Sequence, residues 1–242
     1  MSEGQHIPYA ASALPVPHAR SVLVLAPHPD DETIGCGGSA ALYAQAGIPV
    51  RALVMTDGSL WGAPPPGMGV VEAREAETRA AAQVLGCAEP LFARHPDRHL
   101  PTGAVLVAEI VAQVRASGAD TVFAPSLWEV HPDHRVLAEA AIDALEALGA
   151  GYTLVQYEVG MPLLPNVLVD ITPVLECKHK AMACFVSQLA MQAYDRHVNA
   201  LNVFRTYTLP ASVLAAEGFR VCTPQEARDD PYGLMFQGHA HR

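Results

Sequence analysis

The sequence predicts an α/β fold, a Rossmann-like three-layer sandwich in which helices cover both faces of a mostly parallel sheet. The first observation is that short, nearly continuous apolar runs recur along the chain, as is typical of strands buried on both faces. The second is that alanine-rich stretches alternate with these runs, which suits helices packed on a parallel sheet. The third is composition, because half of the 242 residues are hydrophobic and only 17% are charged, enough for one substantial core.

The chain is expected to form one domain with a short extension at each end. Residues 1–20 contain three prolines and little periodicity, so we interpret them as an extended N-terminal arm laid over the domain or an interface. Residues 21–222 hold the alternating pattern and form the predicted single domain. Residues 223–242 are predicted to be a loosely held C-terminal tail.

The domain is expected to begin with a strand, a helix and a second strand. Val22–Ala26 is an unbroken apolar run that Pro27 ends, which predicts a buried strand. Thr33 is the expected cap of a helix that ends at Gly47, a residue suited to a helix C-terminus. Pro49–Thr56 is the expected second strand, and its polar end should lie at the same sheet edge as the end of the first.

A proline-rich loop and two further helices follow. Leu60–Gly69 contains a run of prolines that excludes a helix or a central strand, so we expect a loop that shapes the substrate pocket. Val70–Gly86 has the pattern of a helix, and Pro90–Arg94 that of a short strand. Gly103–Ser117 predicts the next helix, and Asp120–Ala124 the strand after it.

The second half of the domain should continue the alternation. A helix with an apolar stripe is expected to run to about Leu148, followed by strands at Tyr152–Glu158 and Val167–Ile171. Ala215–Val221 is expected to add an edge strand.

The helix before that last strand has its own start signal. Thr172 is the expected cap, with Pro173 at the first helical position, and the helix should run to about residue 187 or 189. Lys178 and its basic neighbours are interpreted as the solvated face of this helix.

Polar chemistry is concentrated directly after the first strand. His28, Asp30, Asp31 and Glu32 follow the apolar run within six residues. Burying an imidazole and several carboxylates there would cost several kcal/mol unless a cation pairs with them, so the pattern predicts a metal or a positively charged substrate. His28 and Asp31 have the side chains of a zinc site, Asp30 is a spare base, and Glu32 is expected to anchor the turn.

A second cluster follows the apolar run that ends at Pro125. Its sequence is WEVHPDHR, with His131 and His134 three residues apart and Asp133 at the start of the next helix, where the helix dipole favours a carboxylate. A lone buried histidine is usually a core residue. Two strand ends with matching His and Asp clusters instead indicate one shared site. The second cluster would supply the third metal ligand that the first cluster lacks.

Charge and composition exclude several classes of partner. The formal net charge of −10 argues against nucleic acid and anionic membranes, because both need a basic face. No apolar run approaches the ~20 residues of a membrane span, and the N-terminus lacks the features of a signal peptide. The five cysteines lack a CxxC pair and predict no disulfide framework. We therefore expect a cytoplasmic protein that acts on a small neutral or sugar-like molecule.

The two polar motifs also carry a family resemblance. HPDDE after the first strand, with HPDH about a hundred residues later after another strand, resembles the LmbE/PIG-L family of zinc-dependent N-acetylglucosaminyl deacetylases. The segment KHKAMACFVSQL is similar to a family helix and extends the resemblance to about residue 205. The resemblance implies the LmbE-like form of the sandwich and a bound Zn²⁺, with Fe²⁺ as the alternative in the cell.

The resemblance implies specific metal ligands. His28, Asp31 and His134 would hold one zinc ion and leave a fourth position open, as in catalytic zinc sites. Asp30, beside a ligand in the sequence, would be the general base.

Four other residues receive roles from the same resemblance. His131, protonated and held by Asp133, would stabilise the oxyanion and could pass a proton to the leaving amine. Arg74 lies in an R-x-x-E pattern like that of the family helix that offers an arginine to the substrate, and the alternative is a solvated charged face. Asp97 lies in a loop similar to the family's sugar-binding element and would accept hydrogen bonds from sugar hydroxyls.

Taken together, these features predict a zinc-dependent hydrolase that removes the N-acetyl group from an N-acetylglucosamine-type sugar or glycoconjugate and releases acetate. The alternatives are a zinc-dependent amidase or hydratase on the same scaffold, or a non-catalytic metal-binding domain. Glu129 departs from some relatives at the pocket rim and leaves the acceptor sugar open. A homo-oligomer is one state that the sequence allows.

Overall fold

Seven strands form one sheet at the centre of residues 10–233, the part of the chain that this computed structural model describes. The strands are β1 (Val22–Ala26), β2 (Val50–Thr56), β3 (Leu91–His95), β4 (Thr121–Pro125), β5 (Thr153–Tyr157), β6 (Val167–Asp170) and β7 (Ala216–Cys222). Their order in the sheet is β3-β2-β1-β4-β5-β7-β6. The first five are parallel, and β7 is antiparallel to both β5 and β6. The predicted α/β fold with a mostly parallel sheet is confirmed.

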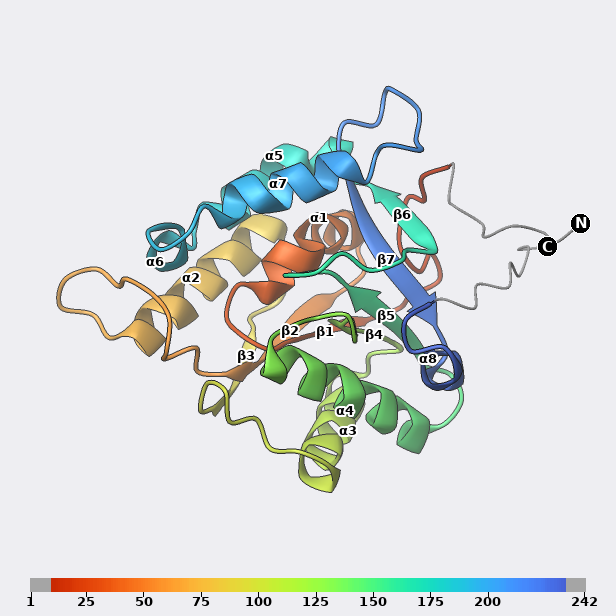
Figure 1. Cartoon of the computed structure of the whole chain (residues 1–242), viewed down its shortest axis with the longest axis horizontal. Helices are drawn as coiled ribbons and strands as arrows, with labels where there is room; N and C mark the ends of the chain where they lie inside the picture. Colours follow the sequence, from red (N-terminus) through yellow and green to blue (C-terminus); the bar gives the residue numbers. More distant parts are fainter. Residues whose placement is uncertain (1–9, 234–242) are drawn as a thin grey trace, which may run out of the picture.

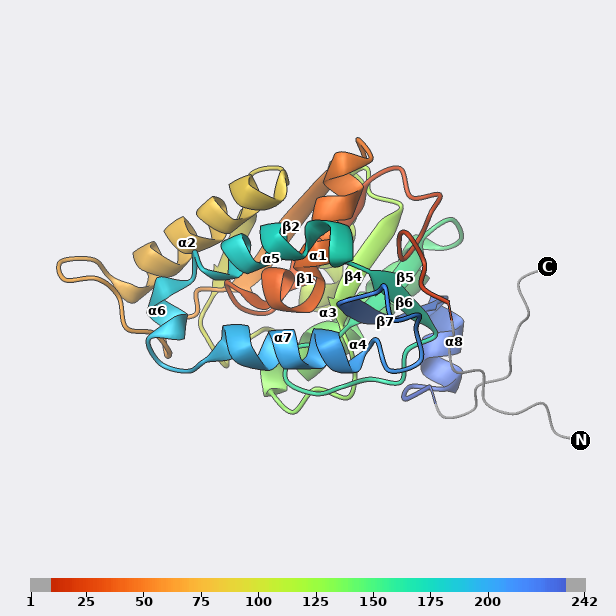
Figure 2. The same ribbon diagram turned by 90° about the horizontal axis from the view of Figure 1, so that it is seen from above.

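Helices form the outer layers of the sandwich. They are α1 (Asp31–Gln45), α2 (Val70–Leu85), α3 (Ala104–Ser117), α4 (Pro132–Leu148), the 3-10 turn η1 (Thr172–Val174), α5 (Leu175–Met182), α6 (Val186–Leu189), α7 (Tyr194–Phe204) and α8 (Pro224–Asp229). Figure 1 shows α1, α2, α5 and α7 on one face of the sheet and α3 and α4 on the other. Figure 2 looks onto the first of these layers, where α5 lies beside both α1 and α2.

The alternating side chains of β1 serve the cores on both faces of the sheet. Val22 and Val24 pack in the cluster under α1 and α5, whereas Leu23 and Leu25 pack in the cluster under α3 and α4. All five residues of β1 are buried. Burial of each such side chain contributes about 1.5–3 kcal/mol, which explains why this apolar run is a central strand.

The chain reverses its direction of travel across the sheet between β1 and β4. From β1 the chain passes through α1 to β2 on one side, and from β4 it passes through α4 to β5 on the other. β1 and β4 are nevertheless hydrogen-bonded neighbours. The carboxyl ends of two such strands border a crevice in open α/β sheets, and ligands bind there.

The start of α1 differs from the prediction. The helix begins at Asp31 after Asp30, which has φ 131°, and Thr33 lies inside the helix and not at its cap. The Glu32 carboxylate anchors the turn as predicted, because it accepts the Asp30 N–H at 3.1 Å and the Thr33 hydroxyl at 3.0 Å. The Glu32 side chain therefore closes the turn before α1. The preference of threonine for capping positions does not decide where this helix begins.

β7 is an internal strand, so the prediction of an edge strand at its position is wrong. It lies between β5 and β6 and buries six of its seven residues. Glu217 and Arg220 are buried in it. Charged residues within an apolar run favour an edge, but here buried partners satisfy them.

The interpretation of Lys178 as a solvated residue is also wrong. Its side chain is 1% exposed, and Nζ lies 2.7 Å from Oε1 of Glu217 on β7. Nζ also donates to the Ile34 carbonyl and to Oδ1 of Asn202, both at 3.0 Å. The single helix predicted from Thr172 is divided into η1, α5 and α6, and Lys178 lies within α5.

The two extensions are partly described. Ser12 forms an isolated bridge with Val169 of β6, so the arm contacts the edge of the sheet there. The predicted loose tail begins instead with α8, which buries Ala227 and pairs Arg228 with Asp143 and Glu146 of α4. Residues 1–9 and 234–242 lie outside the described range. Between residues 10 and 233, no helix has the length and apolar character needed to cross a bilayer.

Candidate metal centre

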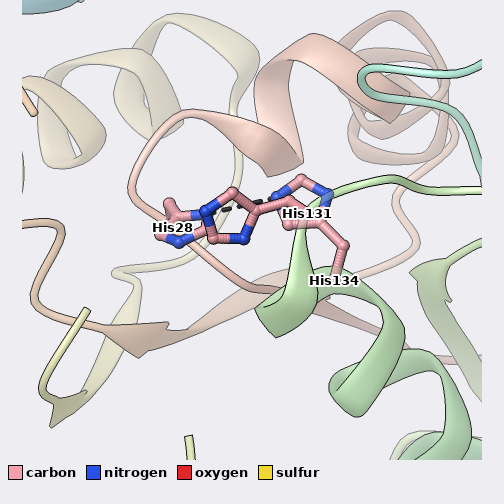
Figure 3. Close-up of side chains that lie close together, drawn as sticks. All are labelled: His28, His131 and His134. Atoms are coloured by element: carbon pink, nitrogen blue, oxygen red, sulfur yellow. Dashed lines mark hydrogen bonds between the residues drawn. The ribbon is translucent and has the colours of Figure 1, made fainter. Parts of the chain in front are cut away.

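The two predicted polar motifs meet at the crevice between β1 and β4. His28 and Asp31 come from the turn between β1 and α1, and His131 and His134 come from the start of α4. Because parallel neighbours deliver their carboxyl ends to the same edge, residues about a hundred positions apart are brought together. Figure 3 shows the three imidazoles converging, with His28 and His134 in direct contact.

Three of these side chains present a triangle of donor atoms. Nδ1 of His28 lies 3.1 Å from Oδ2 of Asp31 and 3.2 Å from Nε2 of His134. Nε2 of His134 lies 3.2 Å from Oδ2 of Asp31. Nitrogen and oxygen ligands about 2.0–2.1 Å from a tetrahedral zinc ion are about 3.3 Å from one another. The triangle therefore fits one divalent cation, and all three residues are buried.

The ring nitrogens that face away from the triangle meet carboxylates. Nε2 of His28 lies 3.2 Å from Oδ2 of Asp133 and 3.4 Å from Oδ1 of Asp97. Nδ1 of His134 lies 3.3 Å from Oε2 of Glu129. Histidine ligands of metals commonly have such outer partners, which set the tautomer and the ring orientation.

Two overlapping groups extend the cluster beyond the triangle. His28, His131 and His134 have ligand atoms within 4.8 Å of one another, and so do His28, Asp97, His131 and Asp133. Both groups share His28 with the triangle and describe the same centre. We favour the triangle as the ligand set because its donor atoms are closest to the spacing that a single ion requires.

The electrostatics of the ligands show a site that attracts positive charge. Burial raises the pKa of Asp31, but the His134 and His28 imidazoles lower that pKa far more. Burial lowers the pKa of His134, but Asp31 and Glu129 raise it to about 9. Buried groups that bind protons strongly are also suited to a divalent cation, because the cation takes the place of the protons.

Asp30 lies beside the triangle and has a different environment. Burial raises the pKa of its carboxyl to about 7, although the Arg74 guanidinium opposes the shift. Oδ2 of Asp30 lies 3.2 Å from Nη2 of Arg74. A carboxyl with a pKa near neutrality suits a general base. Asp30 precedes Asp31 in the sequence but is not itself part of the triangle.

His131 is held by the backbone. Its Nδ1 accepts the Asp133 N–H at 3.2 Å, which caps α4. Burial and the neighbouring imidazoles of His28 and His134 lower its pKa. The predicted arrangement, in which the Asp133 carboxylate holds a protonated His131, is therefore not observed. That carboxylate instead lies against His28 and accepts the Arg98 N–H at 2.7 Å.

The family is decided by comparison with known proteins. The family model PIG-L, described as GlcNAc-PI de-N-acetylase, matches residues 23–145, about half of the chain and both polar motifs. The chain belongs to the PIG-L family. The resemblance that the two motifs carry is thereby confirmed.

Two similar proteins connect this PIG-L chain with named deacetylases. It is 29% identical over 199 residues to the diacetylchitobiose deacetylase of Thermococcus kodakarensis, which covers 75% of this chain and 74% of that one. The structure of N,N'-diacetylchitobiose deacetylase from Pyrococcus horikoshii, complexed with its inhibitor MPG, matches with TM-score 0.75, 27% identity and 86% of both chains.

A third similar structure shares only the fold. GalB, the 4-carboxy-2-hydroxymuconate hydratase of Pseudomonas putida KT2440, matches with TM-score 0.72 and 23% identity over 85% of this chain and 97% of that one. The fold of the PIG-L chain therefore does not select a reaction, and the site residues must do so.

Arg74 of the PIG-L chain lies in the wall of the site. It is 3% exposed, donates from Nη1 to the Gly58 and Trp61 carbonyls, and donates from Nη2 to the Pro29 carbonyl and Asp30. These bonds join the turn after β1 to the loop after β2. The alternative of a solvated charged face is wrong, and its position beside Asp30 favours a role in holding the base.

Asp97 is also turned inward. It is 5% exposed, its Oδ2 accepts the Leu60 N–H at 3.3 Å, and its Oδ1 faces His28. Its own N–H donates to Asp57, which also accepts the Ser59 N–H. Asp57 is thus a turn residue that accepts backbone N–H groups, and Asp97 lies behind His28 of the triangle, in the loop where a sugar contact is predicted.

Glu129 is the residue that the sequence analysis missed. The sequence indicates only a variation at the pocket rim, whereas the Glu129 side chain is 1% exposed and faces His134 of the triangle. A signal was present, because a carboxylate five residues before a predicted ligand histidine can reach its outer nitrogen if the chain turns between them. That turn could not be predicted from the sequence.

Proposed function

We propose that this PIG-L protein is a zinc-dependent deacetylase that hydrolyses the acetamide of an N-acetylglucosamine-type sugar and releases acetate and the free amino sugar. The observation that carries the proposal is the donor triangle of His28, Asp31 and His134 with a separate buried carboxylate, Asp30, next to it. A metal-binding domain without catalysis needs the triangle and has no use for the fourth group.

Zinc is the metal that the ligands fit best. Two imidazoles and one carboxylate are a common ligand set of catalytic zinc, and the spacing of the donor atoms suits tetrahedral geometry. Bound there, the ion polarises a carbonyl oxygen and lowers the pKa of a water molecule towards neutrality. Fe²⁺ accepts the same donors and remains the alternative in the cell.

Asp30 is the proposed general base. Its pKa of about 7 lets the carboxylate take a proton from water at neutral pH and hold it until the next step. Arg74 fixes one carboxylate oxygen through Nη2, so the group is oriented before the substrate arrives. We therefore assign Arg74 to the orientation of the base, and its direct contact with the sugar stays a prediction.

His131 is the proposed donor to the oxygen of the acetamide. Because Nδ1 accepts the Asp133 N–H, the neutral ring carries its proton on Nε2. The imidazole is then an N–H donor at the centre of the cluster, 4.6 Å from the His28 ring between centroids. This N–H can stabilise the developing oxyanion, and Asp30 can pass the proton that it took from water to the leaving amine. A proton transfer from His131 itself stays a prediction.

The class of substrate is supported by the relatives named above, which act on diacetylchitobiose. An N-acetylglucosamine unit supplies the acetamide, and the hydrogen bonds that Asp97 would accept from its hydroxyls stay a prediction. So does a homo-oligomeric state. Cytoplasmic location also remains a prediction, with which the five unpaired cysteines agree.

The test is acetate release combined with metal analysis of the same sample. The protein is stripped with a chelator, reloaded with Zn²⁺, and assayed on N-acetylglucosamine, N,N'-diacetylchitobiose and N-acetylglucosaminides with charged or neutral aglycones. We expect acetate in proportion to bound zinc, up to one ion per chain. One bound ion without acetate from any of these compounds would contradict the proposed reaction and leave a metal-binding protein.

A further inference from the structure

Glu129 is buried directly behind the metal centre. It is 2% exposed and lies in the loop between β4 and α4, two residues before His131. None of the catalytic steps proposed above uses it. A buried carboxylate is costly unless it has partners, so its contacts indicate what it does.

One set of partners is a run of backbone N–H groups after β5. Oε1 of Glu129 accepts from Val159 at 2.8 Å, Gly160 at 3.1 Å and Met161 at 3.3 Å, and Oε2 also accepts from Gly160 at 3.1 Å. A Cβ on Gly160 would lie 3.2 Å from Oε2, so glycine allows this close approach. These contacts alone would make Glu129 an anchor of the loop at 159–161.

The other partner is the ligand His134. Its Nδ1 lies 3.3 Å from Oε2 of Glu129, and no Lys or Arg forms an ion pair with Glu129 in the described part of the chain. The same Nδ1 has no hydrogen bond of good geometry within residues 10–233. The contact is therefore electrostatic. Within residues 10–233 the carboxylate has no Lys or Arg side chain as its partner, and Glu129 Oε2 is the acceptor atom that faces the buried ring nitrogen.

The chemistry of the ligand explains this pairing. Nε2 of His134 points into the donor triangle, and it can bind a cation only with its lone pair free. The ring proton must then be on Nδ1, where it needs an acceptor, and the oxygen that faces it belongs to Glu129.

We propose that Glu129 is a positioning residue that selects the metal-binding tautomer of His134 and couples the metal to the loop at 159–161. The inference rests on the metal site of the proposed function and not on the identity of the substrate. Glu129 then has a second role besides anchoring the loop. The backbone N–H groups of residues 159–161 hold its carboxylate in place against His134.

Glu129→Gln separates the two roles. The amide keeps an oxygen that can accept the N–H groups of residues 159–161, but its NH₂ group would face Nδ1 of His134. An N–H donor at that place favours the tautomer with the proton on Nε2, which blocks metal binding. Glu158→Gln is the matched control, since Glu158 holds the same loop through the Leu163 N–H and pairs with Arg205.

The experiment measures Zn²⁺ affinity by competition with a chromophoric chelator, using full-length protein, and records the visible spectrum of the Co²⁺ form. We expect Glu129→Gln to bind Zn²⁺ about 10–100-fold more weakly and to show an altered Co²⁺ spectrum. Glu158→Gln should keep wild-type affinity within about threefold, even if its melting temperature falls. Hydrogen exchange of the amides at 159–161 should slow on metal binding in the wild type and less so in Glu129→Gln.

The outcomes are distinguishable. Equal metal affinities of wild type and Glu129→Gln would overturn the inference and leave Glu129 a structural anchor. No metal binding by the wild type would overturn the metal site itself. If Glu129→Gln does not fold, Gly160→Ala keeps the carboxylate and crowds Oε2, and it should weaken Zn²⁺ binding by several-fold. An unchanged affinity in that variant would also count against the inference.

Discussion

Two of the buried polar clusters within residues 10–233 differ in how their charges are matched. In the cluster of Lys178 and Glu217, the ammonium has three acceptors, and the carboxylate accepts N–H groups from Gly38 and Ser39 and the Ser39 hydroxyl. All of these hydrogen-bonding partners are groups of the protein itself, so this cluster needs no bound ion.

The metal centre is matched in a different way. The lone pairs of two imidazoles and a carboxylate point at one another within 3.2 Å, with further carboxylates behind the rings. Such an arrangement is repulsive unless protons or a cation lie between the donor atoms. A buried polar cluster whose hydrogen bonds and charges are satisfied within the chain stabilises the fold. A cluster whose metal-donor atoms converge on one point requires a cation or a proton that the chain does not contain.

His134→Ala should have the largest effect on this comparison. Removal of one corner of the triangle leaves two donors, too few to hold a catalytic metal at low concentration. We expect loss of stoichiometric zinc and a fall in acetate release of about 10³-fold or more, since metal polarisation contributes several kcal/mol. Metal content and turnover measured on the same sample check this, and full zinc occupancy in the variant would show that the triangle is not the ligand set.

Lys178→Met should test the self-contained cluster. It leaves the Glu217 carboxylate buried without its cation, which costs about 3–5 kcal/mol of unfolding free energy. Chemical denaturation measures that loss, and zinc affinity of the folded protein should remain within about threefold of wild type. A folded variant that no longer binds zinc would mean that the two clusters are not independent.

Asp30→Asn should separate catalysis from metal binding inside the metal centre. The amide is similar in size but cannot act as a base, so we expect turnover to fall by about 10²-fold. Because Asp30 is not in the triangle, zinc content should stay at the wild-type level. Zinc loss equal to that of His134→Ala would contradict the division of roles between Asp30 and its neighbour Asp31.

Removal of the metal should lower the stability of the folded protein through the metal centre. A ligand present at 100 times its dissociation constant stabilises the folded state by about 2.7 kcal/mol. For a chain of this size, that corresponds to a fall in melting temperature of about 5–10 °C on chelation. Calorimetry with and without chelator measures the shift, with His134→Ala as the control that should show none.

An ion pair between the exposed Arg94 and the buried Glu75 gives the smallest expected effect. Hydrogen bonds from Arg94 and Arg79 hold the pKa of Glu75 below its usual range, although burial opposes the shift. A lowered pKa means that the stabilisation is complete above the unfolded pKa of about 4.3 and is lost as the pH falls through the folded pKa. Arg94→Ala should therefore lower the free energy of unfolding only slightly at pH 7, and the difference should shrink in acid. Urea denaturation at pH 7 and pH 3 checks it, and a constant difference would exclude the ionic explanation.

The sequence by itself determined the strands and the location of the site. Unbroken apolar runs become buried strands wherever they lie, and the carboxyl ends of parallel neighbours must share an edge. The two polar motifs could therefore be placed at one edge before any coordinates were known, because each motif follows such a run. The family resemblance then named His28, Asp31 and His134 as the expected ligands. The order of motifs also predicted the family correctly.

The tertiary structure alone decided which groups pair with which. The Asp133 carboxylate faces His28 and not His131, Arg74 holds Asp30, and Glu129 reaches His134. These pairings depend on where loops from different strands cross, and sequence spacing does not record that. For the same reason the sequence predicts a solvated Lys178. Only the position of β7 shows that the Glu217 carboxylate lies beneath the helix that carries Lys178. Burial of a charge follows from its partners, and partners are brought together by the whole fold.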